Sequence, residues 1–69
     1  MDAVNLSING KLQDVKNNST VRDLIELLGY NPKSVAVAVN GDFVARSQHA
    51  EKVLQENDKV DIVAPMQGG

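Results

Sequence analysis

The sequence contains no cysteine and a single histidine, His49. Without cysteine the chain has no disulfide framework and no thiolate metal site, and one histidine gives no basis for a conventional zinc site. These absences exclude a small secreted protein held together by disulfides. They also lead us to expect no metal bound by this chain.

Clustered positive charge is also missing. The seven basic residues are interspersed with nine acidic ones, and the formal net charge is −2. Proteins that bind nucleic acid rely on clusters of Lys and Arg. Only one Tyr and one Phe are available to stack on bases. We therefore expect no nucleic-acid partner.

Long apolar runs are absent as well. The longest, Val35 to Val39, is far shorter than the roughly 18 residues that a membrane helix needs. Residues 1–5 lack the basic and apolar regions of a signal peptide. We expect a cytoplasmic protein without membrane contact. With 69 residues, 42% of them hydrophobic, the chain predicts one small globular domain, which we expect to be a monomer.

Signatures of catalysis are lacking too. The glycines before the C-terminal segment lie at separate predicted turns, so they form no phosphate-binding loop, and we expect no ATP binding by this chain alone. Asp42 and Ser47 lie near His49 in the sequence, yet their spacing does not support a catalytic triad. We expect His49 to be an ordinary surface or loop residue. The chain is thus predicted to have no catalytic residue.

What the sequence does contain is alternation of apolar and polar residues. Val4, Leu6 and Ile8 are apolar while their neighbours are polar, which is the period of a strand with one buried face. Asn-Gly dipeptides at 9–10 and 40–41 favour tight hairpins. The predicted strands are 4–8, 11–16, 35–39, 42–45 and 59–64.

One helix is predicted after the first hairpin. Thr20 is placed to cap the first turn and Asp23 to return a hydrogen bond in a capping box, while Gly29 stands where a C-terminal cap favours a residue without Cβ. Apolar residues at helical spacing form one stripe. The stripe consists of Val21, Leu24, Ile25 and Leu28.

The remaining segments complete the fold. Strand 35–39 has little polarity on either side, which predicts that both of its faces are covered. Residues 46–55 should be irregular or one helical turn, with Val53 and Leu54 as core anchors. The order β-β-α-β-β-β predicts an α+β protein with the β-grasp architecture, in which the helix packs on one face of a mixed sheet and the first and last strands are parallel neighbours.

The C-terminal segment carries the chemistry. We expect residues 1–64 to form the domain and 65–69 a flexible tail, which when extended spans up to roughly 17 Å. The α-carboxylate of Gly69 is ionised at neutral pH and is a poor acyl acceptor until it is activated. Attack on the α-phosphate of ATP would give an acyl-adenylate, from which a sulfur or amine nucleophile displaces AMP. Two glycines keep the acyl carbon unhindered.

The whole chain resembles the ThiS family of sulfur carriers, which are ubiquitin-like β-grasp proteins of thiamine biosynthesis. The resemblance is carried by residues 8–10, 20–25 and 35–41, by Val44 and Arg46, and by Gly68-Gly69.

The resemblance implies a function for the tail. Gly69 would be adenylated by a ThiF-type adenylyltransferase that uses ATP and magnesium, while this chain binds no cofactor itself. The adenylate would become a thiocarboxylate, with sulfur from a donor such as a cysteine desulfurase, and a ThiG-type thiazole synthase would receive that sulfur. Met66, Gln67 and Gly68 would enter the activating enzyme. The chain would be a co-substrate and not an enzyme.

Two positions depart from the family pattern. Asn57 stands where the family usually has glycine, which is tolerable because Asn also adopts left-handed backbone conformations. Ala45 stands where a proline often precedes the arginine.

A partner surface is expected on the sheet face away from the helix. If Val60 and Ile62 point inward, Val63 points outward, as do Ala36 and Ala38 on their strand. These residues form a candidate apolar contact. Arg46 is a further candidate, which could pair with an acidic patch on a partner.

Three alternatives share parts of this pattern. The chain could carry sulfur for molybdopterin or another thiolated product, or it could be a ubiquitin-like modifier whose acyl-adenylate ends as an isopeptide on a lysine. It could also be a β-grasp binding module whose tail is incidental.

Overall fold

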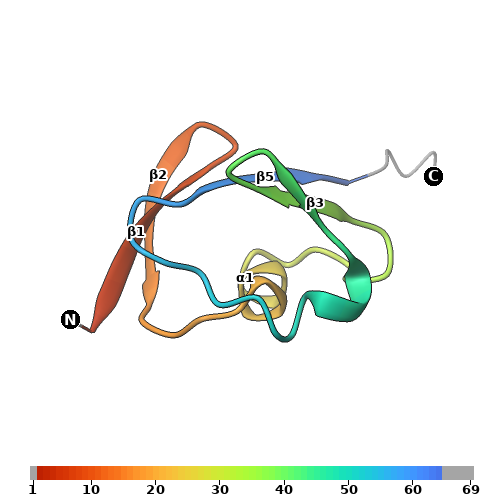
Figure 1. Ribbon diagram of the computed structural model, residues 1–69, viewed down its shortest axis with the longest axis horizontal. Helices are drawn as coiled ribbons and strands as arrows, with labels where there is room; N and C mark the ends of the chain where they lie inside the picture. The colour runs from red at the N-terminus through yellow and green to blue at the C-terminus, as the bar shows by residue number, and fades with distance from the viewer. Residues whose placement is uncertain (1, 65–69) are drawn as a thin grey trace.

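The computed structural model describes residues 2–64 (Figure 1). Their order of elements confirms the predicted β-β-α-β-β-β arrangement, with a short 3-10 helix before the last strand. The elements are β1 (Ala3–Ile8), β2 (Lys11–Lys16), α1 (Val21–Leu27), β3 (Ala36–Val39), β4 (Asp42–Val44), η1 (Arg46–Gln48) and β5 (Lys59–Val63).

The strands form one mixed sheet in the order β2-β1-β5-β3-β4. The last strand therefore lies at the centre of the sheet. It runs parallel to β1, with Ser7 opposite Lys59, and antiparallel to β3, with Ala36 opposite Val63. The parallel pairing of the first and last strands confirms the predicted β-grasp architecture.

The core lies between the sheet and α1, which Figure 1 shows below the sheet. Val37 and Val39 of β3 are buried on this side, but Ala36 on the other face is exposed. The prediction that both faces of this strand are covered is therefore wrong, because α1 packs against one face and no described residue covers Ala36. The buried apolar side chains are Val4, Leu6, Ile8, Val15, Val21, Leu24, Ile25, Val37, Val39, Val44, Leu54, Val60 and Ile62.

Both ends of α1 have the predicted caps. The Thr20 hydroxyl accepts from the Asp23 amide at 3.2 Å, and the Asp23 carboxylate accepts from the Thr20 amide at 3.0 Å, which is a capping box. At the other end Gly29 has a φ of 81°, and the Tyr30 amide donates to the Ile25 carbonyl at 3.0 Å. This pattern is a Schellman motif.

The segment after η1 returns along α1. Leu54 is 1% exposed and confirms one predicted anchor, whereas Val53 is 41% exposed. Val53 forms an isolated antiparallel bridge with Thr20, and in extended backbone adjacent side chains point in opposite directions. Because Leu54 takes the inward direction, Val53 points outward, and its prediction as a core anchor is wrong.

Two hairpin asparagines hold the central strand from both sides. The Asn9 side chain accepts from the Ile62 amide at 2.7 Å and donates to the Ile62 carbonyl at 3.2 Å. Asn40, in the second hairpin, accepts from the Lys59 amide at 2.9 Å. Both asparagines have positive φ, 51° and 54°, so one residue type serves both the turn and the neighbouring strand.

Within residues 2–64 no helix is long and apolar enough to cross a membrane.

Candidate functional site

The predicted reactive tail, Met66, Gln67, Gly68 and Gly69, lies outside the described residues. What the structure describes is the place from which the tail departs. β5 is the central strand, and it ends at Val63 beside Ala36 at the start of β3. A partner that takes the tail would therefore meet the end of the sheet formed by β3 and β5.

A mainly apolar patch covers this part of the outer sheet face, with the half-buried Asp61 beside Ala38. Ala36 pairs with Val63, and Ala38 pairs with Phe43 of β4, so the four side chains share the face away from α1. Phe43 is 70% and Val63 is 65% exposed. We call these four residues the outer patch. Exposed apolar side chains gathered in this way are typical of protein contact sites.

The sequence pattern predicts Ala36, Ala38 and Val63 on this face, and the structure adds Phe43, which was not predicted. The signal was available, because Val44 faces the core and its strand neighbour must face outward. Phe43 is the largest side chain of the patch. It lies on the edge strand β4, where a partner has open access.

Arg46, the fourth residue of the predicted partner surface, does not join the outer patch. It begins η1 and lines a separate hollow together with Arg22 of α1, Lys33 of the loop before β3, and His49. One Arg46 guanidinium nitrogen lies 3.4 Å from the Lys33 carbonyl oxygen. The structure thus divides the predicted surface into an apolar and a basic part.

His49 is not the surface residue that was expected. It follows η1 in an irregular segment, but only 4% of it is exposed. The 3-10 turn directs the ring inward, where its Nε2 lies 3.2 Å from the Val44 carbonyl oxygen. A carbonyl only accepts hydrogen bonds, so this contact assigns the proton to Nε2. The ring links η1 to the end of β4.

The described residues offer no enzyme-like constellation. No group of three or more His, Cys, Asp or Glu side chains among residues 2–64 could hold a metal ion. The His49 ring contacts a backbone carbonyl, and within residues 2–64 no hydrogen bond joins the ring to Ser47 or Asp42.

The two departures from the family pattern fit the backbone. Asn57 has a φ of 69°, a left-handed conformation that Asn tolerates better than most residues. Ala45 has a φ of −63°, which is the value that a proline ring imposes. Both substitutions therefore preserve the local conformation.

A mixed sheet with parallel first and last strands, crossed by one helix, defines a ubiquitin-like β-grasp protein. The model of the ThiS family matches residues 6–69, and the chain belongs to this family.

Solved structures agree with this assignment. The chain is 28% identical to a thiamine biosynthesis protein, ThiS, from Geobacter metallireducens, whose crystal structure it matches with a TM-score of 0.80 over 96% of this chain and 100% of that one. The solution structure of a thiamine biosynthesis protein from the same organism gives a TM-score of 0.81 over 96% of this chain and 88% of that one. A designed protein based on human ubiquitin, 16% identical over 100% of this chain and 98% of that one, has a TM-score of 0.57 and shares the fold.

Two curated relatives are longer proteins. Each carries the name thiazole synthase, one from Magnetococcus marinus at 33% identity and one from Paramagnetospirillum magneticum at 36%, both over 64 residues. The match covers 93% of this chain but 20% of each relative. This chain therefore spans about a fifth of the length of the curated relatives that it matches.

Proposed function

We propose that this protein carries sulfur for thiazole formation in thiamine biosynthesis. The observation that carries the proposal is the pair of matches just described. The chain belongs to the ThiS family, and a segment like it occurs within chains that are called thiazole synthase. A carrier segment and the enzyme that uses it gain effective concentration when they share one chain. For the present chain, a thiazole synthase is accordingly the proposed sulfur acceptor.

The reacting atom in this proposal is the carboxylate carbon of Gly69. A carboxylate oxygen attacks the α-phosphorus of ATP, pyrophosphate leaves, and the acyl-adenylate forms on a ThiF-type partner that holds ATP and magnesium. A sulfur nucleophile then attacks the acyl carbon, and AMP leaves. If the sulfur arrives as a persulfide, from a cysteine desulfurase for example, a thiol reduces the resulting acyl disulfide to the thiocarboxylate.

This chain contributes shape and position to the reaction, while the partners supply the catalysis. The outer patch is the proposed docking surface, because it combines exposed apolar area with proximity to the end of β5. Residues 65–69 can extend at most roughly 17 Å, so a partner must bind close to the outer patch to reach Gly69. Docking at this end of the sheet satisfies that limit.

The experiment adds one alanine after Gly69 and reconstitutes sulfur transfer with purified ThiF-type enzyme, ATP, magnesium, a sulfur source and thiazole synthase. A matched control inserts one alanine between Asn17 and Asn18, in an exposed turn away from the tail. We expect the extended chain to lose thiocarboxylate formation and the control to retain it. Transfer by the extended chain, or isopeptide conjugates in place of a thiocarboxylate, would contradict the proposal.

A further inference from the structure

The hollow that Arg46 lines gathers positive charge on an acidic protein. Arg22, Lys33 and Arg46 border it, and His49 forms part of its wall. No acidic residue is among its lining residues, although the chain has nine acidic residues against seven basic ones. We call this site the basic hollow. Three of the seven basic residues thus line one hollow.

The charge of the basic hollow is only partly neutralised. Arg22 pairs with Glu26 at 3.2 Å, but both side chains are 57% exposed, and ion pairs between exposed residues contribute little. Among the described residues, Lys33 and Arg46 have no ion pair. Instead, the Arg46 guanidinium contacts the Lys33 backbone carbonyl, which leaves the positive charge of both side chains without a carboxylate partner. Positive charges that line one hollow attract an anion.

His49, in the wall of the hollow, has one ring nitrogen without a partner in the described part of the chain. Its Nδ1 is buried and has no hydrogen-bond partner among the described residues, and it is the one such side-chain atom found there. Buried polar atoms in folded proteins are normally hydrogen-bonded, and an unpaired one is unfavourable. With the ring proton on Nε2, Nδ1 is an acceptor and offers a carboxylate no hydrogen bond, so the attraction of the hollow for anions rests on Arg22, Lys33 and Arg46.

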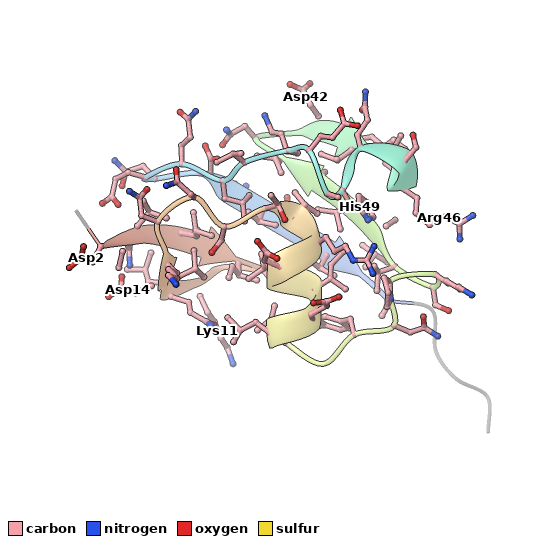
Figure 2. All side chains as sticks on the ribbon, turned by 90° about the horizontal axis from the view of Figure 1, so that it is seen from below. Asp2, Lys11, Asp14, Asp42, Arg46 and His49 are labelled. Carbon is pink, nitrogen blue, oxygen red and sulfur yellow. The ribbon has the colours of Figure 1, made fainter. Side chains whose placement is uncertain are left out.

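The hollow lies where a partner must approach. Figure 1 shows η1 and the segment between α1 and β3 at the end of the molecule where β5 ends. Figure 2 places Arg46 and His49 together toward this end and Lys11 toward the opposite one. The tail is short, so a partner that receives it is brought within reach of the basic hollow.

We propose that the basic hollow is a second docking point, which binds a cluster of carboxylate side chains on the thiazole synthase that receives the sulfur. Its three cationic side chains come from three separate elements, α1, the following loop and η1. Charge spread in this way matches several carboxylates on a protein surface better than one small anion. The identity of the partner rests on the proposed function, whereas the acidic character of the bound surface follows from the hollow.

Two contacts would orient the tail better than one. The outer patch supplies apolar contact on the sheet face, and the basic hollow supplies charge at the adjoining end. Complementary charges raise association rates and exclude wrong orientations. The tail would then enter the partner in one direction.

The test compares charge reversals of equal size at the two ends of the molecule. The double variant Lys33→Glu, Arg46→Glu alters two exposed residues of the hollow, and Lys11→Glu, Lys16→Glu alters two exposed residues of β2. Both variants change the net charge by the same amount. Binding of each full chain to purified thiazole synthase from the same source is measured by titration calorimetry at low and moderate salt, after circular dichroism has verified folding.

We expect the hollow variant to bind about tenfold or more weakly and the β2 variant to bind within about twofold of the original chain. The salt dependence of binding should decrease in the hollow variant alone. Equal affinities of the two variants would overturn the docking inference and leave the sulfur-carrier proposal intact. If the original chain does not bind the synthase, the docking inference is overturned, and formation of the thiocarboxylate on Gly69 decides separately on the carrier chemistry.

Discussion

Replacement of Asn9 tests how the central strand is held in place. The ladder between β1 and β5 joins only Ser7 with Lys59 and Ile8 with Val60. The strand β1 ends before it reaches Ile62, whose backbone amide and carbonyl are instead bonded by the Asn9 side chain at 2.7 Å and 3.2 Å. Asn9 thereby extends the sheet by one position, directly before the tail.

The expected cost of Asn9→Ala has two parts. Loss of two hydrogen bonds costs about 1–3 kcal/mol, at about 0.5–1.5 kcal/mol for each. Asn9 also has a φ of 51°, and an alanine in that conformation costs about 1–2 kcal/mol more. The total of about 2–5 kcal/mol is large against the roughly 3–10 kcal/mol expected for a domain of this size. Asn9→Gly removes the hydrogen bonds without the backbone strain, so it should cost less than Asn9→Ala.

Urea unfolding followed by far-ultraviolet circular dichroism measures these free energies. The slope of the free energy of unfolding against urea concentration should be the same for the variants and the original chain, which checks two-state behaviour. Asn40→Gly is the matched control, because Asn40 has a similar φ but its side-chain hydrogen bonds are exposed. We expect a smaller loss there. Neutral surface substitutions change the free energy of unfolding by no more than about 0.5 kcal/mol. If the free energy of unfolding of Asn9→Gly lies within that range of the original value, the side-chain hydrogen bonds to Ile62 do not hold β5 in place.

Three further substitutions probe the core, a loop and the outer patch. Leu24→Ala empties a fully buried position and should lower the free energy of unfolding by about 2–5 kcal/mol; a loss under about 1 kcal/mol in the same urea assay would contradict the described core. Ala45→Pro should leave the free energy of unfolding unchanged or raise it by up to about 1 kcal/mol, because the φ of −63° suits proline and the preceding Val44 is in a strand. A clear fall in the thermal midpoint would show that the fold needs the Ala45 amide. Phe43→Asp should weaken binding to the ThiF-type enzyme by about tenfold or more while Leu12→Asp, at an exposed apolar position on β2, changes it little; equal effects in calorimetry would remove the outer patch as the docking surface.

Most of the fold could be predicted from short-range patterns in the sequence. The helix and its caps follow from residues within one or two turns of each other, Thr20 with Asp23 at one end and Gly29 at the other. The strands follow from alternation over a few residues, and the two Asn-Gly dipeptides mark the hairpins. A chain this short has few ways to bury the apolar faces of its helix and strands at once, so the β-grasp architecture could be predicted as well.

Features that depend on tertiary packing could not be predicted in this way. His49 is buried because η1 directs its ring to the Val44 carbonyl. No short-range sequence pattern predicts this 3-10 turn. Val53 and Leu54 are adjacent apolar residues, and only the bridge to Thr20 decides which of them faces the core. Arg46 is predicted as part of the same partner surface as the sheet residues, but its guanidinium instead contacts the Lys33 backbone carbonyl. That juxtaposition is visible only in three dimensions.

The central claim is that Gly69 carries sulfur, and intact mass spectrometry tests it most directly. The protein is measured after incubation with ThiF-type enzyme, ATP, magnesium and a sulfur source, and the modified peptide is sequenced. The account predicts a mass gain equal to the replacement of one oxygen by sulfur, located on the C-terminal peptide. An unchanged mass and no trapped adenylate, with an enzyme shown to be active on another ThiS-family protein, would contradict it.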